Sequence, residues 1–381
     1  MTRMKNLVCL LLCLCMMAPA LALAEGDGMD AYVKSAFRKR GTVGGAVIIA
    51  KDGEILYSTG WGRRGESRKN PVTEDTCFRI ASVTKMISGI GLMKLLKEKN
   101  VSPDTPVSEI LGFPVVNPWY KDTPVTVRQV MSHTSSIRAT MSYFPTWEKM
   151  GRGTPYFAEK TAPGEGYEYS NLNGGLLGAM IEALSGQSVN SYMQENVFDP
   201  LGVNAAYHPG LLRDTSDLAD RLNADGSVYQ HVTYALSTLK KYSDTCDPRQ
   251  HTNRTAGGLY ISAQGIYRVL AMLQNDGEWN GVRILPEGAA AEMMADQSLI
   301  PGSSVHCKSP YGLNVIHLNG MTGGTWYGHQ GRVNGLTADA FFQPDTGLIA
   351  VVIGNGHRDP NHHGIATLAY DIMEKAQMYA Q

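Results

Sequence analysis

The chain has 381 residues, 43% of them hydrophobic and 18% charged, and a formal net charge of −1 at pH 7. This composition supports a large buried core and excludes an intrinsically disordered chain. The near-zero charge lacks the basic excess that binds phosphate backbones, so we expect no nucleic-acid partner.

The first 24 residues have the pattern of a secretory signal peptide. Arg3 and Lys5 precede an apolar run from Leu7 to Ala18, and Pro19 and the small-residue sequence Ala22-Leu23-Ala24 follow it. We predict cleavage after this sequence and export to the periplasm, the cell wall or the extracellular space. An uncleaved membrane anchor is the alternative. Because the run is short and Pro19 interrupts it, we expect no stable membrane span after cleavage.

Three cysteines remain after this segment, in a compartment where disulfides persist. Cys77 lies in an apolar stretch, which favours a buried thiol, whereas Cys246 and Cys307 lie in polar, loop-like segments. We therefore predict a Cys246–Cys307 disulfide, with two unbridged thiols as the alternative. Removal of Arg3 and Lys5 also changes the net charge from −1 to −3.

Strand signals cluster at both ends of the remaining chain. Near the start, apolar runs at 45–50 and 54–58 flank Asp52-Gly53. An Asp-Gly pair between two apolar runs favours a tight hairpin. Near the end, runs at 337–342 and 348–353 predict a second hairpin, and a helical pattern follows over about 364–378.

Between these ends the patterns predict helices over 83–97, 172–184, 189–197 and 262–275, joined by loops rich in Pro, Gly, Ser and Thr. No internal repeat or long linker is present, which predicts a single domain over residues 25–381. The expected fold class is α/β (α+β), with an antiparallel sheet built from N- and C-terminal strands and flanked by helices. The sheet part is about 29–80 and 257–381, and an inserted, mainly helical subdomain is about 83–255.

The most informative motif is Ser82-Val83-Thr84-Lys85 at the start of the first predicted helix. Residues three apart share a helix face, so the Lys85 amine can accept the proton of the Ser82 hydroxyl. The backbone N–H of Ser82, free at the helix start, can face a developing oxyanion. The alternative is a helix-start serine beside a solvated lysine, since Ser237-Thr238-Leu239-Lys240 repeats the pattern.

Tyr169-Ser170-Asn171, before the predicted helix 172–184, offers a further proton carrier. Beside a cationic lysine, the pKa of the Tyr169 phenol is expected to fall toward a useful range. The Asn171 amide can hold a substrate carbonyl. A packing tyrosine and a helix-capping asparagine are the alternatives.

His329-Gln330-Gly331-Arg332 precedes the final hairpin. Gly331 allows a close backbone approach, and the Arg332 N–H can supply a second oxyanion donor. A structural histidine is the alternative for His329. His208-Pro209-Gly210 and His362-His363-Gly364 share the His-x-Gly pattern, but neither precedes a predicted strand.

The order of these motifs resembles the serine β-lactamase and penicillin-binding-protein superfamily. The closest branch contains class C β-lactamases, D-alanyl-D-alanine carboxypeptidases, D-aminopeptidases and related esterases. The resemblance covers about residues 29–378 and implies a β-lactamase-like fold. Further segments extend it: Val130-Met131 before Ser132-His133-Thr134-Ser135, Pro163-Gly164, and Ala256-Gly257-Gly258-Leu259.

By this resemblance Ser82 is the acylated nucleophile, and Lys85 and Tyr169 share the base and acid roles. Asn171 binds substrate with the 329–332 segment, and the Ser82 and Arg332 N–H groups form the oxyanion hole. The glutamate that activates the deacylating water in class A β-lactamases has no identifiable counterpart, so Tyr169 is expected to serve hydrolysis too. Such a site needs no cofactor or metal.

The chain departs from the family where His329-Gln330-Gly331 replaces the usual Lys-Thr-Gly. A neutral histidine attracts a substrate carboxylate less than a lysine does, which disfavours β-lactam hydrolysis. Histidine at this position resembles the esterase and D-amino-acid peptidase members of the family, which implies small esters or D-amino-acid peptides, including those of the cell wall, as substrates. The Arg332 guanidinium can restore that charge, unless it is a surface arginine. Ser136, where the related loop usually has glycine, suggests an altered turn.

Two other interpretations remain. His357, Asp359, His362 and His363 suggest a metal site, but their spacing matches no defensible ligand set. A non-hydrolysing penicillin-binding or sensor protein is an alternative to an enzyme, and deacylation separates the two. We expect an exported serine hydrolase that forms an acyl-enzyme on Ser82, with a class C-like β-lactamase as a further alternative.

Overall fold

The computed structural model describes residues 28–380 except for 67–69, 140–145, 153 and 251. The predicted signal peptide therefore lies outside the described residues. Within those residues, none of the helices combines the length and the hydrophobicity that a bilayer span requires.

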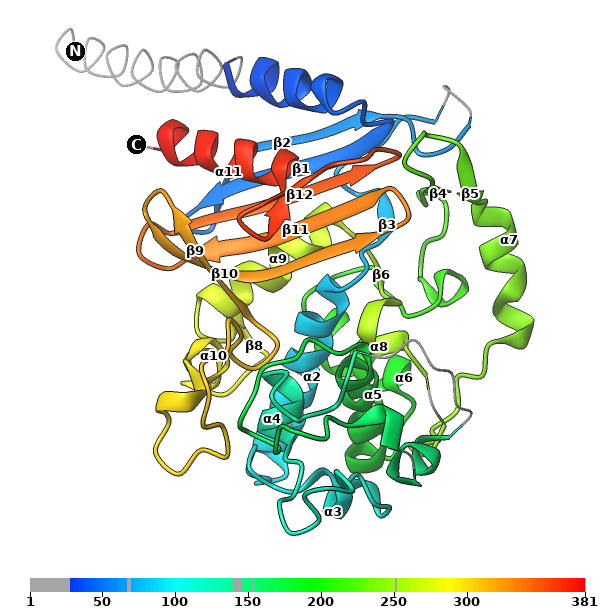
Figure 1. Ribbon diagram of the computed structural model, residues 1–381. Helices are drawn as coiled ribbons and strands as arrows, with labels where there is room; N and C mark the ends of the chain where they lie inside the picture. The colour runs from blue at the N-terminus through cyan, green and yellow to red at the C-terminus, as the bar shows by residue number, and fades with distance from the viewer. Residues whose placement is uncertain (1–27, 67–69, 140–145, 153, 251, 381) are drawn as a thin grey trace, which may run out of the picture.

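A six-stranded antiparallel sheet forms the upper half of the molecule in Figure 1. Its strand order is β2-β1-β12-β11-β10-β9, so strands from the two ends of the chain meet where β1 pairs with β12. Both predicted hairpins are confirmed, and at the first turn Asp52 and Gly53 have φ values of 52° and 84°. The strands are β1 (Gly44–Lys51), β2 (Glu54–Gly62), β9 (Ile316–Met321), β10 (Gly324–Val333), β11 (Leu336–Gln343) and β12 (Leu348–Asn355).

Each face of the sheet packs against its own layer of helices. Ile48 and Ala340 belong to a core shared with α2 (Val83–Glu98) and α9 (Ala263–Gln274). Ile49 and Phe341 belong to a second core with helical residues 28–39 and with α11 (Thr367–Tyr379). Since side chains alternate along a strand, neighbouring residues of one strand face different layers.

The helical part of the chain lies below the sheet in Figure 1, and α2 leads into it from the sheet. The predicted helices are confirmed with small shifts, except that residues 189–197 divide into a short α-helix and a π-helix. The further helices are α3 (Val107–Leu111), α4 (Val127–Met131), α5 (Asn171–Ser185), α6 (Val189–Met193), the π-helix η3 (Gln194–Phe198), α7 (Val232–Ser237), α8 (Arg254–Gly257) and α10 (Ala289–Met294).

Short strands connect the two parts. β3 (Cys77–Arg79) pairs with β6 (Tyr260–Ser262) and runs directly into α2, so this small sheet fixes where α2 begins. The remaining short strands pair as hairpins: β4 (Arg221–Leu222), β5 (Val228–Gln230), β7 (Glu278–Trp279), β8 (Val282–Arg283), β13 (Asn361–His362) and β14 (Ile365–Ala366).

The predicted Cys246–Cys307 disulfide is wrong, because all three cysteines of the described part of the chain are free thiols. Cys246 lies near the end of α5, where its Sγ is 3.5 Å from the Glu182 carbonyl oxygen. Cys307 follows a residue whose N–H donates to the Gly164 carbonyl oxygen, in a different loop. The polar residues around each cysteine predicted that both lie in surface loops. They could not show that the two loops are separate. Cys77 is buried as predicted.

Candidate active site

Ser82 lies at the junction between β3 and α2. It is the N-cap residue of α2, and its side chain makes no capping hydrogen bond, so the hydroxyl remains available. The preceding Ala81 has a φ of 48°, a left-handed conformation that is costly for alanine. This sharp turn presents a partly exposed Ser82 at the start of a helix whose first turn is otherwise buried.

Lys85 lies one turn into α2 and is fully buried. Its Nζ donates to Ser82 Oγ at 3.1 Å, to Asn171 Oδ1 at 2.8 Å and to the Ala256 carbonyl oxygen at 2.6 Å. Burial lowers the pKa of Lys85 to about 7, because a charged amine is poorly solvated there. A large fraction of Lys85 is therefore neutral near pH 7.

The partners of Lys85 determine where its lone pair points when the amine is neutral. The oxygens of Asn171 and Ala256 can only accept, so they take the two remaining protons of the amine. The third position, toward Ser82 Oγ, is then left for the lone pair. This arrangement orients Lys85 to remove the proton of Ser82.

Tyr169 lies beside this pair, just before α5. Lys85 Nζ is 4.9 Å from the centre of the Tyr169 ring, and the Tyr169 hydroxyl is buried. Burial raises the pKa of Tyr169 to about 12, although the neighbouring Ser82 side chain offsets part of the rise. The expected fall in this pKa is wrong, because desolvation outweighs any attraction to a lysine that is itself largely neutral. The α5 N-cap is Ser170, and Asn171 instead contacts Lys85.

Gly331 on β10 lies against the start of α2. A Cβ atom at this position would lie 2.3 Å from the Ile80 carbonyl oxygen, 3.0 Å from the Ser82 nitrogen and 3.2 Å from the Val83 nitrogen. Only glycine lets the strand come this close. The close approach places β10 against the Ser82 nitrogen, so the next residue along the strand, Arg332, stays the expected second donor of an oxyanion hole.

His329 faces the same side of the sheet as Gly331 and is fully buried. Burial, with Lys85 nearby, lowers the pKa of His329 to about 3, so its imidazole is neutral. Strand alternation turns the side chains of Gln330 and Arg332 to the opposite face. The exposed Arg332 lies there near Asp339 and His357. Burial raises the pKa of Asp339 to about 8, and Arg332 offsets part of that rise. Burial also lowers the pKa of His357, and Arg332 adds to that fall. Only the backbone of Gln330 and Arg332 therefore faces the site.

Sequence patterns did not assign roles to three further groups around Ser82. The Ala256 carbonyl contacts Lys85, and the rings of His133 and Tyr311 pack against Tyr169 with centroids 4.4 Å and 5.9 Å away. His133 and Ala256 belong to segments that carried the family resemblance, so the signal was present. Tyr311 lies in Tyr311-Gly312-Leu313, which shows no pattern of its own.

The alternative motifs do not form a site. Ser237 is exposed and donates to the Tyr234 carbonyl oxygen rather than to Lys240. His208 accepts from the Gly210 N–H, which makes it a structural residue. His362 and His363 are exposed on β13 and in the turn after it.

His357 and Asp359, whose residue types suggested a metal site, have other partners. His357 is buried between the hydroxyls of Thr42 and Thr337, and Asp359 accepts from the Leu368 N–H. Across the described residues, no three His, Cys, Asp or Glu side chains are placed to hold a metal ion.

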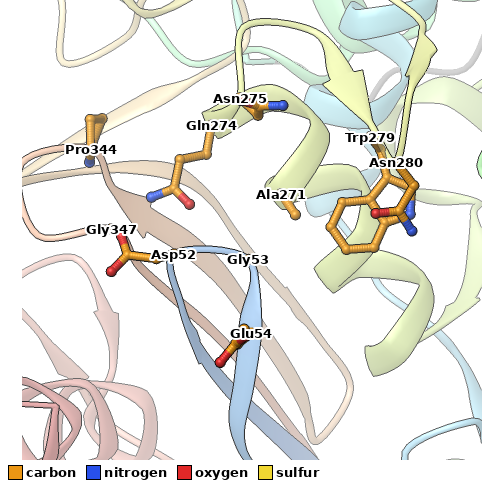
Figure 2. A pocket seen from close by; sticks show the side chains of 10 residues that line it. All are labelled: Asp52, Gly53, Glu54, Ala271, Gln274, Asn275, Trp279, Asn280, Pro344 and Gly347. Carbon is orange, nitrogen blue, oxygen red and sulfur yellow. The ribbon is translucent and has the colours of Figure 1, made fainter.

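A separate cavity of about 520 Å³ lies between the β1–β2 turn and the end of α9 (Figure 2). Asp52, Glu54, Gln274 and Trp279 are among its lining residues, and none of the groups around Ser82 lines it. We therefore place the candidate active site at the start of α2 and not in this cavity.

The chain belongs to the beta-lactamase family, whose model matches residues 29–372. It is 30% identical over 203 residues to esterase EstB of Burkholderia gladioli, a match that covers 46% of this chain and 49% of that protein. It is also 30% identical over 178 residues to penicillin-binding protein 4* of Bacillus subtilis (strain 168), covering 42% and 37%. These matches span about half or less of each relative.

Solved structures confirm the β-lactamase-like fold. A structure of the octameric penicillin-binding protein homologue from Pyrococcus abyssi superposes with a TM-score of 0.71 at 22% identity, covering 93% of this chain and 77% of that one. The D-amino acid amidase from Ochrobactrum anthropi SV3 superposes with a TM-score of 0.68 at 20% identity, covering 92% and 99%. At these identities the likeness establishes the fold alone.

Proposed function

We propose that this protein is a serine hydrolase that forms an acyl-enzyme on Ser82. The observation that carries this proposal is the geometry of Lys85, whose amine lies 3.1 Å from Ser82 Oγ while Asn171 and Ala256 occupy its other directions. A surface lysine near a serine would be solvated and charged, whereas Lys85 is buried with its pKa lowered to about 7. Family membership and the esterase relative support the same reaction class.

Acylation follows from these contacts. Lys85 takes the proton of Ser82, and Oγ forms a bond to the substrate carbonyl carbon while the carbonyl oxygen becomes negative. The N–H groups of Ser82 and Arg332 stabilise that oxygen. The proton then passes from Lys85 through the Tyr169 phenol to the leaving group, whose bond to carbon breaks. Tyr169 stays neutral overall, as its raised pKa requires.

Deacylation reverses the path with water as the nucleophile. A water molecule that enters where the leaving group departed gives its proton to Tyr169, which passes a proton to Lys85 and so returns one to Ser82 Oγ. The hydroxide equivalent bonds to the acyl carbon, and the ester bond to Oγ breaks. Tyr169 is thus the proton carrier of both steps.

The preferred substrate has an uncharged acyl and leaving group, as in small esters or D-amino-acid amides. The His329 imidazole is neutral, and the Arg332 guanidinium is on the other face of the sheet. The 329–332 segment therefore offers no fixed positive charge to a substrate carboxylate. This disfavours β-lactams and peptides that end in D-alanine, including those of the cell wall.

Intact mass measurement with parallel turnover assays tests this function. Wild type and Ser82→Ala are mixed with a p-nitrophenyl butyrate ester, a D-phenylalanine amide, a D-alanyl-D-alanine peptide and a penicillin. We expect rapid ester turnover and a transient adduct on wild type only. Equal ester turnover by Ser82→Ala would refute the mechanism, and preferential turnover of the penicillin or of the peptide would refute the substrate class.

A non-hydrolysing penicillin-binding protein is the second candidate, because penicillin-binding protein 4* is among the relatives. It predicts a stable penicillin adduct on Ser82 and no turnover of any substrate in the same experiment.

We also propose that the protein is exported, on the basis of the pattern in residues 1–24. Cell fractionation with N-terminal sequencing tests export, which predicts a mature protein that begins at Glu25.

A further inference from the structure

His133 contacts the chain on both sides of Tyr169. Its carbonyl oxygen accepts from the Glu168 N–H at 2.9 Å, and its Nδ1 accepts from the Ser170 N–H at 3.2 Å. Its ring also packs against the Tyr169 ring, with centroids 4.4 Å apart and planes 36° apart. A single residue therefore holds the backbone before and after Tyr169 as well as its side chain.

The backbone of His133 makes this double contact possible. Its φ of 58° is left-handed, a conformation that histidine and asparagine adopt more readily than most residues. Such a turn lets the carbonyl group and the side chain of one residue reach the same neighbouring segment. His133 is 1% exposed, so these contacts are shielded from water.

Hydrogen bonds fix the tautomer of His133. A second donor, Asn173 Nδ2, lies 3.3 Å from Nδ1, and its amide orientation is set because Asn173 Oδ1 accepts from the Ser135 hydroxyl at 2.8 Å. Nδ1 must therefore be the acceptor, so the ring proton is on Nε2. Nε2 is buried and has no hydrogen-bond partner in the described part of the chain. The nitrogen that contacts Ser170 can act only while the imidazole is neutral.

We propose that His133 is a positioning residue for Tyr169, and that it sets the angle at which the phenol meets Ser82 and Lys85. The inference rests on the proposed function, in which Tyr169 carries protons in both half-reactions. Proton transfer depends steeply on the distance and alignment of donor and acceptor, and a displacement of about 1 Å can cost on the order of 100-fold in rate. His133 touches neither the nucleophile nor its base, so its effect passes through Tyr169.

The variant that tests this role is His133→Asn. The asparagine Oδ1 takes the place of Nδ1, so it can still accept from Ser170 and Asn173, and asparagine tolerates the left-handed backbone. The ring against Tyr169 is lost. We expect kcat for the ester to fall roughly tenfold to 100-fold while KM changes less than about twofold, because Tyr169 acts in the chemistry rather than in binding.

A double-mutant cycle with Tyr169→Phe separates positioning from a general structural effect. If His133 acts through Tyr169, His133→Asn lowers kcat by less than about twofold once the phenol is absent. Equal losses in both backgrounds would overturn the inference while leaving the proposed function intact. Full activity of Tyr169→Phe alone would overturn both, because the inference requires Tyr169 in the chemistry.

His208→Asn is the matched control. His208 also accepts a backbone N–H at Nδ1, from Gly210 at 3.0 Å, and its ring lies 4.7 Å from the Tyr242 ring, outside the site. We expect it to lose some thermal stability and to keep its kcat. If His133→Asn does not fold, His133→Gln, which also lacks the ring, enters the same cycle. Unchanged kcat in the folded variant would overturn the role of His133.

Discussion

The Lys85 amine titrates in a pH range where most lysines stay protonated. Burial lowers its pKa to about 7, and only the neutral amine can accept the Ser82 proton. We therefore expect kcat/KM for a neutral ester to fall about tenfold per pH unit below about pH 7, since such a substrate does not titrate. Stopped-flow or steady-state assays from pH 5 to 9 would measure this, and a flat profile between pH 5 and 7 would contradict the role of Lys85.

The same burial makes Lys85 costly for the folded state. The unfolded side chain binds a proton up to about pH 10.5, whereas the folded one releases it near pH 7. The free energy of unfolding therefore decreases as pH falls from about 10.5 to about 7, because only the unfolded state gains the proton in that range. We expect Lys85→Met to be inactive but more stable than wild type at pH 7, by on the order of 3–5 kcal/mol. Urea unfolding at pH 7 and pH 10 checks this, and the gain must shrink at pH 10.

Individual residues differ in how far the sequence could place them. Motif spacing predicted Ser82, Lys85 and Tyr169 as site residues, and the structure brings them together. The orientation of the Arg332 side chain and the direction of the Tyr169 pKa shift could not be predicted, because strand register and burial are properties of the folded chain. The contacts of His133 depend on a left-handed backbone conformation, which a histidine in the sequence does not predict.

At the scale of elements, the contact between β10 and the start of α2 defines the site. A Gly331→Ala Cβ would meet the Ile80 carbonyl oxygen and the Ser82 nitrogen, so the strand must move away and the oxyanion hole must widen. We expect kcat to fall roughly 100-fold to 1,000-fold, the effect typical of a lost oxyanion donor. Ester kinetics of the purified variant measure this fall.

Gly257→Ala provides a control for the glycine substitution. Gly257 lies on α8 next to Ala81, but a Cβ there would have no contact shorter than 3.6 Å, which is ordinary van der Waals contact. Its kcat should stay within about threefold of wild type, since nothing near Ser82 needs to shift. Similar losses in the two variants would show that the site tolerates no added methyl group at all, and would remove the special role of the β10 contact.

The hairpins and long helices were predictable because each has a local signal, such as Asp52-Gly53 or an apolar face. β9 and β10 were harder, since glycines at Gly320, Gly324 and Gly328 dilute the alternating pattern of a strand. The pairing of β1 with β12 also required the fold, because no local pattern joins residues about 300 positions apart in the sequence.

At the scale of the whole molecule, the three cysteines in the described part of the chain are free thiols, where a Cys246–Cys307 disulfide was expected. Cys246 is exposed, Cys307 is partly exposed and Cys77 is buried with its pKa raised to about 12. We expect a maleimide reagent to label Cys246 and Cys307 in the native mature protein and Cys77 only after unfolding. Reducing agents should leave the Tm unchanged. A Tm that falls on reduction would instead indicate a disulfide.

Asp339, a buried acid on the face of the sheet away from Ser82, has the opposite effect to Lys85 on how stability changes with pH. Burial raises the pKa of Asp339 to about 8, so the folded carboxyl keeps a proton that the unfolded one loses near pH 3.8. Stability is then lost as pH rises through this window, with the full cost above about pH 8. Asp339→Asn should gain stability over wild type by on the order of 3–5 kcal/mol more at pH 9 than at pH 5. Urea unfolding at both pH values measures it, and equal gains would contradict the assignment.

The meeting of β1 with β12 has a consequence for synthesis on the ribosome. A nascent chain carries Ser82 and Lys85 early, but β10, the strand that completes the proposed oxyanion hole, begins only at Gly324. Long-range strand pairing of this kind folds slowly and late. Ser82 is therefore synthesised long before β10 can complete its site. Incomplete chains released during translation would carry the serine without its reactivity.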